Sequence, residues 1–135
     1  MWLFTKYGFF SIACADKQGS KTLDPDIFMI RARSRQHLVN LQERFKDIEL
    51  FQVPIIESRE ADYRYRLVVS KALWIQAVSA LLEEQTWRNF KNEATAFEKL
   101  KKLSSGYADS LHRIWEVMFQ FQIDELPDRN DSKRV

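Results

Sequence analysis

Glycine and proline are scarce in this chain, with three of each among 135 residues. These two residues interrupt regular secondary structure more strongly than any others. Because they are scarce, the chain has few positions suited to loops that require unusual backbone angles. That scarcity favours an architecture rich in helix. Hydrophobic residues make up 45% of the chain and charged residues 30%. The composition therefore excludes collagen-like, low-complexity and largely disordered chains, and the length suits one domain with its own core.

Period-2 alternation of apolar and polar residues predicts strands. The clearest case covers residues 63–69, where Leu67 and Val69 lie on a face shared with Tyr63 and Tyr65. Leu67 and Val69 are therefore expected to be buried. Three other segments also favour strands: residues 2–5, 9–15 and 27–33. Gly8 separates the first two of these and predicts a tight turn or a bulge, because glycine tolerates positive φ.

Apolar residues at helical spacing predict helices over residues 35–46, 71–85, 93–104 and 107–123. Ser34 and Ser70 stand where an N-capping hydroxyl is expected, and Gly106 is a candidate C-terminal cap. Residues 16–26 read as a hairpin loop, and residues 47–61 as an irregular connection. Pro54 in that connection argues against a central strand.

This order of elements favours an α+β fold. We expect a small, mostly antiparallel sheet covered by helices on one face, in a ferredoxin-like variant with extra C-terminal helices. The domain is expected to span residues 1–123. Residues 124–135 are polar, carry Pro127 and are expected to form a flexible tail that is dispensable for folding.

Several classes of site are disfavoured by composition. The formal net charge is +2, which lacks the strong basic excess of a dedicated nucleic-acid binder, although a local basic face remains compatible with it. The single Cys14 excludes an internal disulfide and, with two histidines, gives no zinc-ligand spacing. No glycine-rich phosphate loop is present, so we expect neither a metal nor a cofactor. No apolar run reaches the roughly 18–20 residues of a membrane span.

Four arginines form the first candidate site. Arg31 and Arg33 are two residues apart in one predicted strand, and Arg64 and Arg66 are two apart in another. Each pair shares a face of its strand. If the two strands pair antiparallel with matching faces, four guanidinium groups converge. Such a patch suits phosphates or carboxylates, because each guanidinium offers a planar two-point donor.

A solvated sheet face is the competing interpretation of the same arginines. In that case their charges pair with the acidic side chains of the preceding segment, which are Glu57, Glu60 and Asp62. Exposed ion pairs on an outer face are ordinary and contribute little to stability. This interpretation assigns the arginines no ligand, and it is the more common outcome for such a pattern.

A second candidate is the segment Trp87-Arg88-Asn89-Phe90-Lys91-Asn92, read as a short extended piece. Asn89 and Lys91 offer an amide and a cation between aromatic rings, a mixture that suits nucleic-acid bases and phosphates. The alternative is that Trp87 and Phe90 fill the core at a helix junction, because large aromatic side chains are usually buried.

Two functions of different class follow. The first is a non-enzymatic interaction module that binds a protein or nucleic acid through the arginine-bearing sheet face, or forms a homodimer through an apolar surface. The second is a small enzyme that clamps a phosphorylated or carboxylated substrate with arginines and moves a proton with His112 or a tyrosine. No catalytic triad or nucleophile elbow accompanies His112, so the sequence favours the interaction module.

The opening Met1-Trp2-Leu3-Phe4-Thr5, the segment Asp62-Tyr63-Arg64-Tyr65-Arg66 and the motif Asn89-Phe90-Lys91 resemble a family of short bacterial proteins of uncharacterised function. The resemblance runs from Met1 to about Phe121. It implies a complete, cytoplasmic protein that begins at the family's own start. It assigns no catalytic residue.

Overall fold

A computed structural model describes residues 1–101 and 106–127 of the chain. It contains two compact units, Met1–Phe90 and Lys91–Val135, which we call the N-terminal and C-terminal units. Each is considered by itself below. The expectation of one domain over residues 1–123 stays a prediction, because the division into two compact units does not show whether they fold and unfold together.

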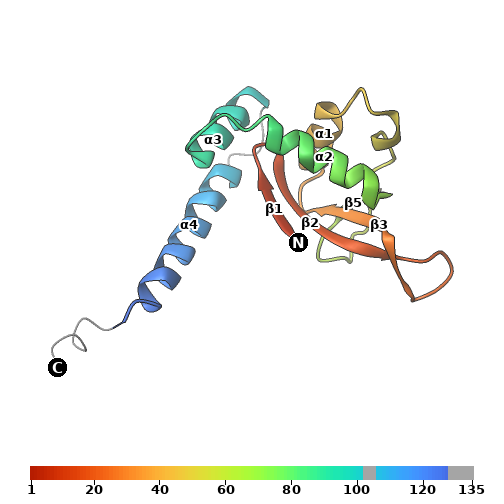
Figure 1. The fold of residues 1–135 in the computed structure, drawn as a ribbon, viewed down its shortest axis with the longest axis horizontal. Coiled ribbons are helices and arrows are strands. Elements are labelled where there is room, and N and C mark those ends of the chain that lie inside the picture. The colour runs from red at the N-terminus through yellow and green to blue at the C-terminus, as the bar shows by residue number, and fades with distance from the viewer. Residues whose placement is uncertain (102–105, 128–135) are drawn as a thin grey trace. The chain divides into compact units, whose positions relative to one another are not determined.

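The N-terminal unit is built on a five-stranded sheet in which all neighbours pair antiparallel (Figure 1). The strand order is β1-β2-β3-β5-β4. The strands are β1 (Trp2–Thr5), β2 (Gly8–Asp16), β3 (Leu23–Ala32), β4 (Ile56–Glu57) and β5 (Tyr65–Ser70). With four helices in addition, the structure confirms the α+β class and the antiparallel sheet.

The ferredoxin-like description is not established by these pairings. That motif contains a split βαβ unit, in which a helix joins two strands with another strand between them. Here β3 and β5 are joined through α1 and β4, yet they are direct neighbours and antiparallel. The first three strands follow one another as a meander.

Two helices, α1 (Arg35–Arg44) and α2 (Lys71–Glu83), pack against the inner strands of the sheet. Their apolar side chains Leu38, Leu41 and Trp74 are buried, as the helical spacing predicts. The sheet residues that meet these helices are also buried: Phe10, Ile12, Ile30, Leu67 and Val69. The predicted burial of Leu67 and Val69 is confirmed, and we call this side of the sheet the covered face.

The turn before β2 places Gly8 against α1. Gly8 has φ of +148°, which confirms the expected special backbone at this position. A Cβ on Gly8 would overlap the ring of His37, so the helix approaches the turn as closely as it does because no side chain intervenes. Phe9 N–H donates to Nδ1 of His37 at 3.2 Å, and the Asn40 amide donates to the Tyr7 carbonyl at 3.2 Å.

In the hairpin between β2 and β3, the strands are longer and the loop that joins them is shorter than the sequence predicts. The segment read as a loop over residues 16–26 instead contains the start of β3, from Leu23. The register shifts between Cys14 and Ala15, and Pro25 lies within β3. An irregularity in the pairing accommodates a proline, which cannot donate to a regular ladder.

The connection over residues 47–61 contains two elements that its irregular pattern conceals. One is the short 3-10 helix η1 (Glu49–Phe51), and the other is β4, the edge strand that pairs with β5. Neither is long enough to produce a periodic pattern. Pro54 precedes β4, in agreement with the argument against a central strand.

The two serine caps differ. The Ser70 hydroxyl accepts from the N–H of Leu73 at 3.1 Å, which confirms the expected cap of α2. Ser34 occupies the N-cap position of α1, but its side chain makes no capping hydrogen bond. The prediction is therefore right about where α1 starts and wrong about what satisfies its first turn.

The C-terminal unit contains α4 (Gly106–Asp124) and all of α3 (Phe90–Lys101) except its first residue. Helix α3 begins at Phe90, so the expected extended piece over residues 87–92 is wrong for its last three residues. Gly106, the expected C-terminal cap of the preceding helix, is the first residue of α4, and the structure does not describe residues 102–105, where that preceding helix was expected to end. Most of the expected tail, residues 128–135, also lies outside the described residues. Within the described ranges, no helix is both long enough and apolar enough to cross a membrane.

Candidate functional site: an arginine and aromatic sheet face

The face of the sheet opposite the covered face carries two arginines directly across from each other. The register of β3 and β5 pairs Arg31 with Arg66, and that of β2 and β3 pairs Ser11 with Arg31. Directly paired residues project to the same side of a sheet. The antiparallel pairing that the sequence argument required is therefore present, and Arg31 and Arg66 share what we call the open face.

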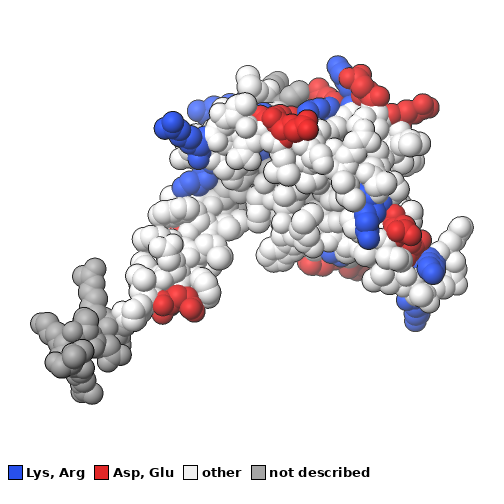
Figure 2. Space-filling view, viewed as in Figure 1, with Lys and Arg blue, Asp and Glu red and all other residues white. Residues whose placement is uncertain are grey.

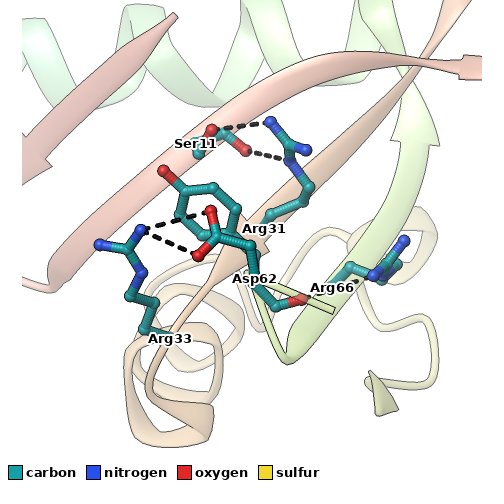
Figure 3. A network of polar contacts seen from close by, with 6 residues as sticks. Ser11, Arg31, Arg33, Asp62 and Arg66 are labelled. Carbon is teal, nitrogen blue, oxygen red and sulfur yellow. Dashed lines mark hydrogen bonds and ion pairs between the residues drawn. The ribbon is translucent and has the colours of Figure 1, made fainter. Parts of the chain in front are cut away.

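Neutral groups hold both of these guanidinium groups in place. Arg31 donates to the Ser11 hydroxyl at 2.9 Å and to the Ser11 carbonyl at 3.4 Å, as Figure 3 shows. Arg66 donates to the Tyr63 carbonyl at 3.4 Å and lies 3.9 Å from the Met29 sulfur. Its Nε is buried and has no hydrogen-bond partner among the residues that the structure describes. Among residues 1–101 and 106–127, neither arginine forms an ion pair, so their positive charges are oriented without being neutralised.

Tyr63 organises the arginines of this face. The guanidinium of Arg31 lies 4.8 Å from the centre of the Tyr63 ring, and that of Arg33 lies 4.6 Å from it. Both distances are within the range of cation–π attraction. The ring itself is buried. Arg33 also meets the Asp62 carboxylate at 3.4 Å, with both side chains mostly exposed (Figure 3).

The position of Tyr63 corrects the sequence prediction, which placed its ring on the same face as Leu67. Strand β5 begins only at Tyr65, so the alternation does not extend back to Tyr63. Its ring lies instead by Arg31 and Arg33, and 6.4 Å from the Phe9 ring. Strand β5 therefore begins two residues later than the pattern predicts, and the Tyr63 ring contacts the arginines of the open face.

Arg64 behaves differently from the other three arginines. Its guanidinium bonds the Glu57 carboxylate on β4 at 2.7 Å, and Arg59 meets the same carboxylate at 3.6 Å. The hydrogen bond from Arg64 lowers the pKa of Glu57 and raises that of Arg64. The structure thus gathers Arg31, Arg33 and Arg66 around Tyr63, while Arg64 follows the solvated-face interpretation at the edge of the sheet.

A row of aromatic rings continues the open face toward the edge strand β1. Phe4 and Phe9, paired in register, stack with ring centres 4.5 Å apart. The Trp2 ring meets Phe9 edge-on at 5.7 Å and is 68% exposed. Through Phe9 the row reaches the buried Tyr63 ring, so ring contacts link the exposed indole to the guanidinium groups of Arg31 and Arg33.

The sequence argument missed these aromatic residues, although the pattern that reveals them is in the strands. In residues 2–5, Trp2 and Phe4 alternate with Leu3; in residues 9–15, Phe9 and Ser11 alternate with Phe10 and Ile12. Because both sets consist mostly of apolar residues, the alternation does not separate a buried face from an exposed one. Only the register with β3 shows which set joins the arginines.

The other candidate residues have different surroundings. Asn89 lies in the connection that precedes α3, and the Lys91 ammonium lies over the Trp115 ring at 4.6 Å within the C-terminal unit. His112 meets Glu116 at 3.2 Å one turn along α4, and its side chain is 59% exposed. These contacts hold Lys91 and His112 on the helices of their own unit.

Tyr7 is the tyrosine with the clearest charged partners. Its hydroxyl donates to Glu84 at 2.8 Å, and Arg44 bonds the second oxygen of the same carboxylate at 2.7 Å. Burial, together with the Glu84 carboxylate, raises the pKa of Tyr7 far above its ordinary value. A phenol held in its protonated form by such a partner is a poor general base at neutral pH. The cluster ties the β1–β2 turn to α1 and the end of α2.

Comparison of the chain with protein-family models, with curated proteins and with solved structures finds no match. The resemblance to a family of short bacterial proteins therefore stays a prediction. In the described residues, no group of three His, Cys, Asp or Glu side chains is arranged to hold a metal ion.

Proposed function

We propose that the open face of the sheet binds single-stranded nucleic acid, and that the protein acts as a non-enzymatic interaction module. The observation that carries the proposal is the direct pairing of Arg31 with Arg66, without a described carboxylate on either. Like charges opposite each other on neighbouring strands destabilise a sheet. A bound phosphate relieves that repulsion, so the arrangement favours an anionic ligand.

The aromatic row favours nucleic acid over a simple anion. Proteins that bind single strands combine cationic side chains for the backbone with aromatic rings on which bases stack. Trp2 is largely exposed and contacts Phe9, which leads to Tyr63 and its two arginines. Arg33 can exchange its exposed Asp62 partner for a phosphate at small cost, because exposed ion pairs contribute little. The surface thus offers both kinds of contact.

The enzyme alternative has less support. His112 belongs to the C-terminal unit and is more than half exposed, and the protonated state of Tyr7 disfavours it as a base. An acidic protein segment is the other partner class that the arginines suit, but it would leave the exposed indole without a role.

A cytoplasmic location, which the single cysteine favours, is part of the same proposal.

Titration of a fluorescently labelled oligothymidylate at two salt concentrations tests the proposal. Replacing Arg31 and Arg66 together by Gln should weaken binding and reduce the slope of log K against log salt by about 1.4, since each phosphate contact to a single strand contributes about 0.7. Trp2→Ala should weaken binding roughly tenfold or more through lost stacking. Arg35→Gln is the matched control, because Arg35 is an exposed arginine on α1, which packs on the covered face.

Polyphosphate and polyglutamate distinguish the alternatives. Equal binding of polyphosphate and oligothymidylate, with no effect of Trp2→Ala, would reduce the site to a simple anion site. Preferential binding of polyglutamate would point to an acidic protein partner. Absence of oligothymidylate binding at low salt would refute the proposal and leave the solvated-face interpretation.

A further inference from the structure

A groove lies on the covered face of the sheet, between helix α2 and the strands β2 and β3. In the middle of this face Phe10, Ile30 and Leu67 are completely buried. Further along the same strands, Cys14 and Phe28 are opposite each other in the register and are only partly buried. The groove has a volume of about 530 Å³, and its lining residues all belong to the N-terminal unit. This volume is in the range of small-molecule sites, roughly 300–1,000 Å³.

One side of α2 forms a wall of this groove. Four of its lining residues recur at helical spacing: Lys71, Trp74, Ile75 and Val78. Residues three and four apart are neighbours on one side of a helix. Trp74 is buried, whereas the aliphatic Ile75 is 58% exposed. The surface where α2 runs beside β1 and β2 is largely uncharged in the space-filling view (Figure 2). The groove therefore has an apolar wall that the fold itself does not cover.

Lys71 carries the only charged side chain among the described residues that line the groove. Its ammonium lies 5.3 Å from the centre of the Phe28 ring, which also lines the groove. Within residues 1–101 and 106–127, Lys71 forms no ion pair. Because Lys71 is the first residue of α2, its charge lies at one end of the helical wall. An aromatic ring thus holds a cation at this end of the groove, and no carboxylate in the described residues neutralises it.

The chemistry of this lining indicates the class of ligand. The Ser79 hydroxyl donates to the Ile75 carbonyl at 2.8 Å, so its hydrogen bond is made inside the helix. What remains is apolar surface with one cation at its end. In small-molecule sites the apolar lining binds the body of the ligand, and a few polar groups fix its orientation. A complementary ligand has an apolar body and a single anionic group at one end.

Charge and length narrow the class further. One ammonium balances the single charge of a carboxylate, whereas a phosphate monoester carries between about 1.5 and 2 charges at neutral pH. The wall of the groove on α2 extends from Lys71 to Ser79, which is about 12 Å at the helical rise per residue. An extended decanoate chain has a similar length. These properties favour an aliphatic carboxylate.

We propose that the groove between α2 and the strands β2 and β3 binds a carboxylic acid with an apolar chain, in the class of medium-chain fatty acids. The chain lies against Ile75, Val78 and Cys14, and the carboxylate meets the Lys71 ammonium. Removal of the chain from water drives binding, and the charge pair sets its direction. The groove is on the covered face, so it is separate from the proposed nucleic-acid surface on the open face.

Protection of Cys14 from alkylation tests the site directly, because Cys14 lines the groove and is the only cysteine of the chain. The full chain reacts with iodoacetamide, a neutral reagent, and mass spectrometry follows the rate with and without decanoate below its micellar concentration. Saturating decanoate should slow the reaction severalfold. Oligothymidylate should leave the rate unchanged, because its proposed site is on the other face of the sheet.

The role of the charge is tested by Lys71→Met, which keeps an apolar side chain of similar length. This change should raise the decanoate concentration that half-protects Cys14 about tenfold, because the charge pair is lost. The value for decanol should stay the same. Lys46→Met is the matched control: Lys46 is exposed and follows Arg44, whose partner Glu84 lies just after the end of α2. It should leave protection by decanoate unchanged.

The role of the apolar wall is tested by Ile75→Asp, which puts a carboxylate where the chain of the ligand lies. Protection by decanoate should weaken about tenfold or more, because apolar contact is lost and like charges repel. Gln76→Asp adds the same charge at the next residue, which does not line the groove, and should leave protection unchanged. Circular dichroism establishes whether both variants keep their helices, and Lys71→Met tests the site independently of them.

Three results would overturn the proposal. One is a rate of Cys14 alkylation that saturating decanoate does not change. Another is equal protection by decanoate and decanol together with no effect of Lys71→Met, which would show that the site does not recognise a carboxylate. The third is a Cys14 that reacts only after unfolding in urea, which would show that the groove is closed to small molecules. None of these outcomes depends on oligonucleotide binding, so the two proposals fail separately.

Discussion

The two faces of the sheet are made by alternate residues of the same strands, yet they are built on different physical principles. On the covered face, Phe10, Ile30 and Leu67 are completely buried beneath helices. On the open face, Arg31 opposes Arg66 and an exposed indole adjoins them through Phe9 and Tyr63. The covered face stabilises the fold through apolar burial, whereas the open face accepts like-charge repulsion. We therefore expect substitutions on the two faces to separate stability from binding.

The sharpest test compares adjacent residues of β5. Leu67→Asp places an unpaired carboxylate in the core and should lower the free energy of unfolding by about 3–5 kcal/mol, because buried charge without a partner is costly. Val68→Asp puts the same group on the open face, where Val68 is 37% exposed, and should cost about 1 kcal/mol or less. Urea denaturation followed by circular dichroism measures both. Similar losses for the two variants would show that the faces are not distinct.

A second test concerns the close approach of α1 to the β1–β2 turn. Gly8→Ala should cost roughly 2 kcal/mol or more, because the new Cβ overlaps His37 and the backbone has positive φ. Gly19→Ala is the control: Gly19 has φ of +73° with nothing within 4 Å of an added Cβ, so only backbone strain of about 1 kcal/mol applies. Thermal melting of the two variants separates steric overlap from strain.

The buried His37 should make stability depend on pH. Burial lowers its pKa below the ordinary value of 6.5, so the folded protein favours the neutral ring. The unfolded chain then binds the proton more readily, and stability is full above about pH 6.5 and falls as the pH drops below it. His37→Gln should flatten the pH dependence of urea denaturation between pH 7.5 and 5, although it lowers stability at pH 7.5. An unchanged slope in His37→Gln would contradict the assignment.

The smallest effects are expected on the open face. Arg33→Gln removes a mostly exposed ion pair with Asp62 and should change stability by about 1 kcal/mol at most. Replacing Arg31 and Arg66 together by Gln should leave the melting temperature unchanged or raise it, because the cross-strand repulsion disappears. A large loss of stability in the double variant would mean that the arginines serve the fold, and that the faces are not divided between stability and binding.

The sequence predicts the α+β class, the main strands and the two helices of the N-terminal unit, because each has a periodic apolar pattern. It does not predict η1 and β4, which are too short to show a period. The spacing of the arginines predicts that each pair shares a face of its strand, and the pairing of β3 with β5 places Arg31 and Arg66 on one face of the sheet. Arg64 could not be assigned to Glu57 from spacing alone, because that contact depends on an edge strand hidden in an irregular segment.

Local sequence by itself determined where the chain forms strands and helices, which positions along them are apolar, and which arginines are two residues apart. These properties follow from the period of each element and from the chemistry of neighbouring residues. Only the tertiary structure decided that Trp2, Phe9 and Tyr63 join the arginines, since this depends on the register of three strands. Register is set by contacts between residues far apart in the chain, and shifting it by one residue would exchange the two faces.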